Sequence, residues 1–150
     1  MSGLSIDHLG AGDVRTMREL LALFGEAFEE PDTYLGAQPD DAYREELLAK
    51  DHFIALVARD GDRVVGGLAA YVLDKFEQAR GEVYIYDLAV AATHRRRGIA
   101  TALIEALKPL ARARGAWVIF VQADRGDTPA IRLYESLGAR EDVHHFDIPV

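Results

Sequence analysis

Three consecutive arginines stand directly before a glycine in the segment "HRRRGIA", residues 94–100. Apolar residues recur at helical spacing after it, so the arginines are predicted to precede a helix N-terminus. Unpaired backbone N–H groups and the positive end of the helix dipole favour an anion there. Gly98 and Ala100 would let a phosphate approach the backbone closely. The segment therefore predicts phosphate binding, and a solvated basic turn paired with nearby acids is the open alternative.

Carboxylates near the end of an apolar segment predict a second kind of binding. Asp124 follows "WVIFVQA", residues 117–123, and so lies at the carboxyl edge of a predicted strand, where open α/β sheets bind ligands. Asp147 interrupts the apolar "HHFDIPV" and is predicted to reach the same edge. Acidic groups there would attract a cation and raise its encounter rate. Ordinary surface charge is the alternative, and it covers most of the acidic stretch 29–41.

The order of the strands and helices expected around these residues indicates the α+β class, with a mixed sheet and helices on its faces. Asp60 and Gly61 predict a tight hairpin between two antiparallel strands. Strands are expected at 4–8, 53–59, 64–73, 82–90, 117–123 and 143–148. Helices are expected after Asp13, after Asp40, over 98–112 and from Thr128 to Gly138, with a loop around Pro31, Gly36 and Pro39. Pro109 is expected to kink or end the third helix near Leu107.

Composition narrows the classes of function. The chain has 150 residues and is expected to form one domain, 1–150. It has no cysteine, which excludes thiolate metal sites and a cysteine nucleophile, and we predict no metal centre. A net charge of -8 and a pI near 5.0 argue against nucleic-acid binding. Without an apolar run of about 20 residues or an export signal, no membrane association is expected, and we predict a cytoplasmic protein.

Arg95, Gly98 and Ala100 match the pattern (Gln/Arg)-x-x-Gly-x-(Gly/Ala), and with the preceding "LAV" this segment resembles the GNAT acyltransferase superfamily. The resemblance implies a mixed, mostly antiparallel sheet of six to seven strands, with one splayed parallel pair and about four flanking helices. It also implies acetyl-CoA as cofactor. The residues expected to bind it are Leu88, Ala89, Val90, Arg95, Arg96, Arg97, Gly98, Ile99, Ala100 and Thr101.

The same resemblance places the reacting thioester between the parted strands and suggests the catalytic groups. An alkyl amine is mostly protonated near neutrality, so a base must remove a proton before it attacks. Asp87 is the favoured base, with Glu82 acting through water as the alternative. Tyr134, in "IRLYESLGA", matches the tyrosine that faces the cofactor sulfur in this superfamily. Without a cysteine to carry an acyl group, direct attack in a ternary complex is expected.

Five segments suggest a narrower resemblance, among them "EVYIYDLAV", "HRRRGIATALIEAL" and "VQADRGDTPAIRLYESLGARE". From about residue 13 to 148 the chain resembles the gentamicin-acetylating type of aminoglycoside 3-N-acetyltransferases. This implies acetylation of the 3-amino group of 2-deoxystreptamine, antibiotic resistance and a homodimer. The residues expected to bind the cationic acceptor are Tyr86, Asp124, Asp127, Glu141 and Asp147. Superfamily members often carry asparagine where Asp127 stands, which also suggests a capping role for this acid.

Three alternatives remain open at this point. The acceptor could be a polyamine or a protein amine instead. The chain could be a non-catalytic acyl-CoA-binding regulator, which the presence of both Asp87 and Tyr134 disfavours. An RNA-binding module using Arg95–Arg97 ranks last, because the net charge opposes it and exposed aromatic residues do not alternate with the arginines.

Overall fold

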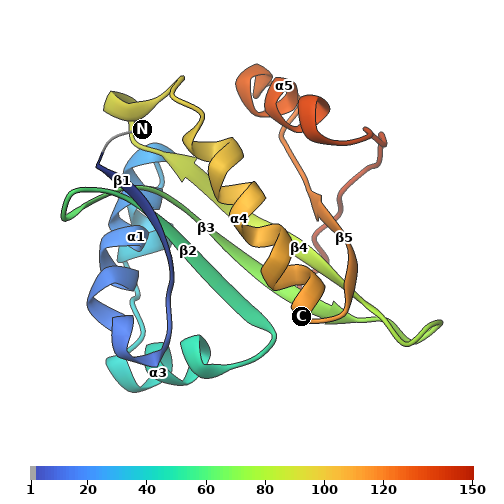
Figure 1. Ribbon diagram of the computed structural model, residues 1–150, viewed down its shortest axis with the longest axis horizontal. Helices are drawn as coiled ribbons and strands as arrows, with labels where there is room; N and C mark the ends of the chain where they lie inside the picture. Colours follow the sequence, from blue (N-terminus) through green and yellow to red (C-terminus); the bar gives the residue numbers. More distant parts are fainter. Residues whose placement is uncertain (1–2) are drawn as a thin grey trace. The chain divides into compact units, whose positions relative to one another are not determined.

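The computed structural model describes residues 3–150, which divide into two compact units (Figure 1). The first ends at Phe120 and the second comprises Val121–Val150. The elements of the first unit are β1 (Leu4–His8), η1 (Ala11–Asp13), α1 (Val14–Ala27), α2 (Pro31–Leu35), α3 (Asp41–Ala49), β2 (Phe53–Asp60), β3 (Arg63–Asp74), β4 (Gly81–Val90), η2 (Ala92–His94), α4 (Ile99–Ala113) and β5 (Ala116–Val121), whose last residue belongs to the second unit. The second unit contains α5 (Thr128–Leu137).

The five strands form one sheet in the order β1-β2-β3-β4-β5. β1 to β4 pair antiparallel in sequence order. β5 joins β4 at the start of both strands: the Gly81 N–H donates to the Gly115 carbonyl at 2.9 Å, and the rings of Tyr84 and Phe120 stack with centroids 4.7 Å apart. Because both contacts advance along the two strands in the same direction, β4 and β5 run parallel.

Helices cover both faces of the sheet, as two adjacent glycines of β3 show. A Cβ on Gly66 would lie 3.2 Å from Ile99 of α4, and one on Gly67 would lie 2.3 Å from Leu20 of α1. Successive residues of a strand point to opposite faces, so α1 and α4 lie on opposite sides. Glycine at 67 is what allows α1 to approach the backbone this closely.

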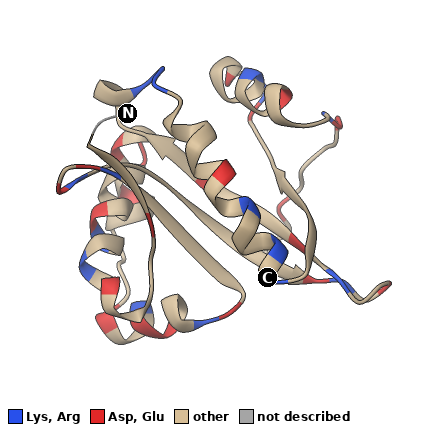
Figure 2. Cartoon of the chain, viewed as in Figure 1, with Lys and Arg blue, Asp and Glu red and all other residues tan. Residues whose placement is uncertain are grey.

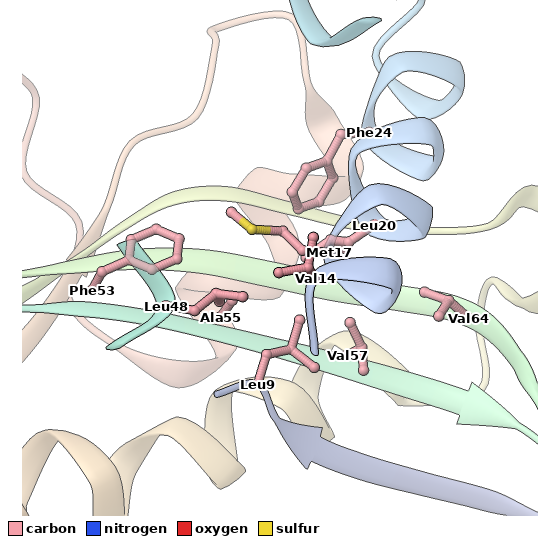
Figure 3. Close-up of a cluster of buried hydrophobic side chains, with 10 residues drawn as sticks. All are labelled: Leu9, Val14, Met17, Leu20, Phe24, Leu48, Phe53, Ala55, Val57 and Val64. Atoms are coloured by element: carbon pink, nitrogen blue, oxygen red, sulfur yellow. The ribbon is translucent and has the colours of Figure 1, made fainter. Parts of the chain in front are cut away.

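The core on the α1 side is built from apolar residues of α1, α3, β2 and β3. Met17, Leu20 and Phe24 of α1 belong to one buried cluster with Ala55 and Val57 of β2 (Figure 3), and Leu20 lies against Gly67 of β3. Their spacing along α1 is the helical periodicity that predicted this element. Burying such side chains contributes about 1.5–3 kcal/mol each, which holds α1 and the segment after it against the sheet.

The α+β class, the antiparallel strands and the parallel pair are confirmed, with differences in the details. Five strands are present in residues 3–150, where six to seven were expected, and there are five α-helices where about four were expected. The predicted strand at 143–148 is absent: residues 139–150 contain neither helix nor strand. A strand needs a hydrogen-bonded neighbour, and within the second unit the only strand residue is the last residue of β5. Residues 143–148 therefore have no strand to pair with inside that unit.

Three local features differ wholly or in part from the expectations. The segment expected as a loop around Pro31 contains α2, because proline favours the first turn of a helix. Asp127 caps α5 by accepting from the Ala130 N–H at 3.2 Å, which confirms the capping role suggested for this acid and leaves Thr128 as the first helical residue, not the cap. Of the two outcomes expected at Pro109, an end of the helix near Leu107 is wrong, because α4 continues to Ala113. Burial of Leu107 and Ala111 on either side of this exposed proline offsets the hydrogen bond that it removes.

No helix within the described part of the chain is long and apolar enough to cross a membrane.

Candidate functional site

The turn before α4 has the backbone geometry of an anion site. Arg96 has φ 62° and Gly98 has φ 75°, so the chain twice adopts the left-handed conformation over three residues. Left-handed residues in such a turn are typical of a nest, a concave arrangement in which successive N–H groups face an anion. No side-chain oxygen caps the helix at Gly98, and a Cβ there would meet nothing within 4 Å. The open, uncapped N-terminus fits a phosphate group.

The base of this turn is fixed to the β2–β3 hairpin. His94 is buried, and its Nε2 lies 2.9 Å from Oδ2 of Asp60. The Thr93 hydroxyl lies 2.7 Å from His94 Nδ1, and the Ala91 N–H donates to the Val65 carbonyl at 2.8 Å. These contacts hold the chain on the N-terminal side of the arginines, so that the N–H groups of the turn are set before a ligand arrives.

Positive charge is concentrated on this turn. Arg95, Arg96 and Arg97 are all exposed. Lys and Arg colour the turn in Figure 2, whereas Asp and Glu are spread over α1 and α3. The arginine charges and the helix dipole favour the same ligand, an anion.

Leu88, Ala89 and Val90 form the end of β4 that leads into this turn. On one side they pair with β3, opposite Leu68, Gly67 and Gly66 respectively. β5 ends at Val121, one residue after the ring that stacks on Tyr84, while β4 runs six residues beyond Tyr84. β4 therefore continues beyond the position at which β5 ends; the splaying of the two strands stays a prediction.

A β-bulge at Tyr86 decides where Asp87 points. Ile85 lies opposite Ala70 and Asp87 lies opposite Ala69, so Tyr86 is the extra residue of β4. Residues directly opposite each other share a face of the sheet. Asp87 therefore lies on the face of Ala69, which packs against the core on the α1 side. Without the bulge, strict alternation would place Asp87 on the face of the buried Ile85.

Asp87 is a half-buried carboxylate held by one hydrogen bond from another element. The Tyr34 hydroxyl of α2 donates to its Oδ1 at 2.9 Å. Burial raises the pKa of Asp87 above its usual value, the hydrogen bond from Tyr34 lowers it, and the negative charge of Glu30 raises it further. Burial prevails, so this carboxylate is a better proton acceptor than an exposed aspartate.

Tyrosine rings form a wall on the same strands. Tyr86 packs edge-on against Tyr71, with centroids 5.9 Å apart, and against Tyr84 at 5.8 Å. Burial is the main cause that raises the pKa of Tyr71 and Tyr84, and the charge of Asp87 raises both further. Tyr86 is 63% exposed. Its ring can therefore pack against an acceptor that approaches Asp87.

Glu82, the other predicted base, lies at the opposite end of β4. Its Oε1 lies 3.8 Å from Lys75 Nζ, and its Oε2 accepts from Trp117 Nε1 at 3.0 Å. Five residues separate Glu82 from Asp87, a span of about 15 Å along a strand. The carboxylate is thus engaged in contacts at the start of the parallel pair.

Tyr134 and the remaining predicted acceptor residues belong to the second unit. Tyr134 is half-buried in α5, and burial together with the charge of Asp127 raises its pKa to about 12. Asp127 caps the same helix, and Asp147 lies 2.9 Å from His145. Asp124, Asp127, Glu141 and Asp147 are exposed. Their roles towards an acceptor stay predictions.

Sequence reasoning missed Tyr34. It lies in the acidic stretch that we interpreted as a loop of surface charge, and 53 residues separate it from Asp87. In the sequence, the one feature that marks Tyr34 is its position between Pro31 and Pro39.

The comparisons with known proteins agree with this geometry. A family model described as the acetyltransferase (GNAT) family matches residues 16–139. An aminoglycoside acetyltransferase from an uncultured soil metagenomic sample, HMB0005, is 60% identical, with 100% of this chain and 99% of that chain covered and a TM-score of 0.97. A second soil metagenomic aminoglycoside acetyltransferase, meta-AAC0020 in complex with sisomicin, is 33% identical over 99% of this chain and 97% of that chain, with a TM-score of 0.91.

More distant similarity extends to mammals. N-acetyltransferase family 8 member 2 of Rattus norvegicus is 31% identical over 90 residues. The match covers 60% of this chain and 40% of the rat protein, so it concerns only a part of that longer relative.

Proposed function

The chain belongs to the acetyltransferase (GNAT) family, and we propose that its acceptor is an aminoglycoside antibiotic, acetylated on the 3-amino group of the 2-deoxystreptamine ring. The observation that carries the proposal is the 60% identity over the whole chain with an aminoglycoside acetyltransferase. A relative that is 33% identical binds sisomicin, which is itself a polycation. The net charge of -8 suits such an acceptor. The 3-amino position and the gentamicin type come from the sequence resemblance.

Acetyl-CoA is the acetyl donor of this family, and when bound it supplies the acetyl group as a thioester. In this chain the nest at Arg96–Gly98 and the N-terminus of α4 would hold its pyrophosphate. The backbone of Leu88–Val90, beyond the contact with β5, would pair with its pantetheine arm. Arg95 and Arg97, with Ile99, Ala100 and Thr101 of the first helical turn, complete the proposed cofactor site.

We assign the role of general base to Asp87. It accepts a proton from the ammonium group of the acceptor, which leaves a neutral amine able to attack the carbonyl carbon. Its raised pKa and its place beside exposed Tyr86 support this choice over Glu82, which is engaged by Lys75 and Trp117. A new N–C bond forms as the C–S bond breaks, and the nitrogen then loses its second proton to solvent. Attack is proposed to be direct, because the chain has no cysteine to carry an acyl group.

Tyr134 is assigned to the leaving thiolate. With a pKa of about 12 it stays protonated at neutral pH and donates from its hydroxyl to the sulfur. Asp124, Asp127, Glu141 and Asp147 are assigned to the remaining ammonium groups of the acceptor. A single acetyltransferase domain, a homodimer and a cytoplasmic location remain part of the proposal; the family match, which includes residues of both units, supports the first of these.

The test is release of the CoA thiol from acetyl-CoA with gentamicin, sisomicin, spermidine and a lysine-rich peptide as acceptors. We expect the two aminoglycosides to give the highest kcat/KM, and NMR of the product to locate the acetyl group on the 3-amino nitrogen. Preference for spermidine or the peptide would support the alternative acceptors instead. Acetylation at another amino group would refute the regiochemistry alone, and cofactor binding without turnover would favour a regulator.

A further inference from the structure

We propose that Tyr34 is a positioning residue for the reaction: its hydroxyl holds Asp87 by one oxygen, Oδ1, so that the other oxygen is directed at the amine of the acceptor. The inference rests on the proposed role of Asp87 as base. It adds a residue of α2 to the proposed site.

Tyr34 is well placed to fix a carboxylate because its own ring is fixed. The ring packs against Phe28, with centroids 5.6 Å apart, and against Phe24 at 5.9 Å. The Tyr34 N–H donates to the Glu30 carbonyl at 3.3 Å, which ties the residue to the turn between α1 and α2. Phe24 belongs to the buried core. The hydroxyl is therefore presented to Asp87 from a rigid aromatic cluster.

The hydrogen bond has an electrostatic as well as a geometric effect. Tyr34 donates to the ionised carboxylate, and this lowers the pKa of Asp87 against the upward effect of burial. The other groups facing Asp87 are Glu30, whose charge raises the pKa of Asp87, and Tyr71 and Tyr84, whose own pKa values the charge of Asp87 raises. Tyr86 of β4 packs against both Tyr71 of β3 and Tyr84 of β4. Of the groups named here, Tyr34 is the one that lowers the pKa of Asp87.

Tyr34 itself remains a donor throughout the range of an assay. Burial, the hydrogen bond to Asp87 and the nearby negative charges raise its pKa well above the ordinary value for tyrosine. Its contribution to Asp87 is thus constant with pH, and any change in the acid limb of the rate profile reports Asp87.

Tyr34→Phe isolates the hydroxyl, because phenylalanine keeps the ring that packs on Phe24 and Phe28. Without the hydrogen bond the ionised form of Asp87 loses stabilisation, so its pKa rises. We expect the acid limb of kcat/KM for the acceptor to move upward by about one pH unit. We also expect kcat at pH 7 to fall about ten-fold, because the carboxylate is less well oriented. The matched control is Tyr43→Phe, which removes a hydroxyl from a tyrosine of α3 that is 57% exposed.

Three measurements make the outcome decisive. Titration of the Asp87 carboxyl carbon by NMR in wild type and Tyr34→Phe reports the pKa without requiring activity. The thermal midpoint and the Kd for CoA report whether the fold and the cofactor site persist, and the pH profile reports catalysis.

An upward shift in both the carboxyl titration and the acid limb, with the control unchanged, supports the inference. An unmoved titration overturns it, whatever the activity. If the carboxyl pKa moves but wild type acetylates no amine in the panel, or Asp87→Asn retains full activity, the proposed function or the assigned base fails instead. Equal shifts in Tyr43→Phe would make the effect a general consequence of losing a hydroxyl and would refute the specific role.

Discussion

The two ends of β4 carry a carboxylate each, and their surroundings differ in kind. Glu82, near the start, keeps 20% of its side chain exposed and is engaged by Lys75 and Trp117. Asp87, beyond the bulge, is half-buried, accepts one hydrogen bond from the neutral Tyr34, and has its pKa raised by burial. In general, a nearby cation and an N–H donor favour the ionised form of a carboxylate, whereas burial favours proton uptake. Residue type alone therefore does not select the base.

The largest expected effect is that of Asp87→Asn. Asparagine keeps the shape of the side chain and can still accept from Tyr34, but it takes up no proton. General-base catalysis contributes about 10²- to 10⁴-fold, so kcat should fall within that range while the Kd for CoA changes less than about two-fold. Steady-state kinetics and calorimetry measure the two quantities. Equal losses in turnover and in cofactor affinity would contradict the assignment.

A smaller effect is expected at the turn that follows β4. Gly98→Val places a branched side chain at φ 75°, a strain of about 1–3 kcal/mol that disturbs the nest. The KM for acetyl-CoA should rise about ten-fold or more, with little change in the KM for the acceptor. The matched control is Gly115→Val, which has φ 78° and equally open space near the start of β4. A similar rise in KM for the control would show that the effect is one of stability.

The fold was more predictable than the site because its signals are local. The Asp40 side chain accepts from the Tyr43 N–H three residues on, and Gly61 adopts φ 62° in a two-residue turn. Both features depend on neighbours in sequence, and both were predicted. The continuation of α4 through Pro109 was not predicted. Packing of Leu107 and Ala111 against the rest of the protein outweighs the tendency of proline to end a helix.

The site depends on two features that periodicity does not reveal. The segment "EVYIYDLAV" was predicted as one continuous strand, and the bulge at Tyr86 that turns Asp87 to the α1 side is recognised only from the pairing with β3. Tyr34 reaches Asp87 across 53 residues of sequence. The turn before α4, by contrast, was predicted because its arginines, its glycine and the helix are contiguous in the sequence; that it binds phosphate stays a prediction.

Tyr134 is predicted to assist the leaving group, whereas Asp87 is predicted to take a proton from the amine. Tyr134→Phe should lower kcat about ten-fold at neutral pH, because the leaving thiolate loses one hydrogen bond to a charged group. A leaving group that needs less assistance should restore the rate, so the deficit should shrink with an acetyl thioester of a more acidic thiol. An unaltered rate with acetyl-CoA would assign Tyr134 to packing within α5.

The smallest effect is expected for Glu82→Gln, and it is the most direct test of the contrast along β4. Glutamine can still accept from Trp117 and loses only the attraction to Lys75, a partly exposed pair 3.8 Å apart. Such pairs contribute about 0–1 kcal/mol. We expect kcat and its pH profile to stay within about two-fold of wild type, with a small fall in the thermal midpoint. A loss as large as that of Asp87→Asn would mean that Glu82 acts through water across about 15 Å, and the contrast between the two ends of the strand would have to be abandoned.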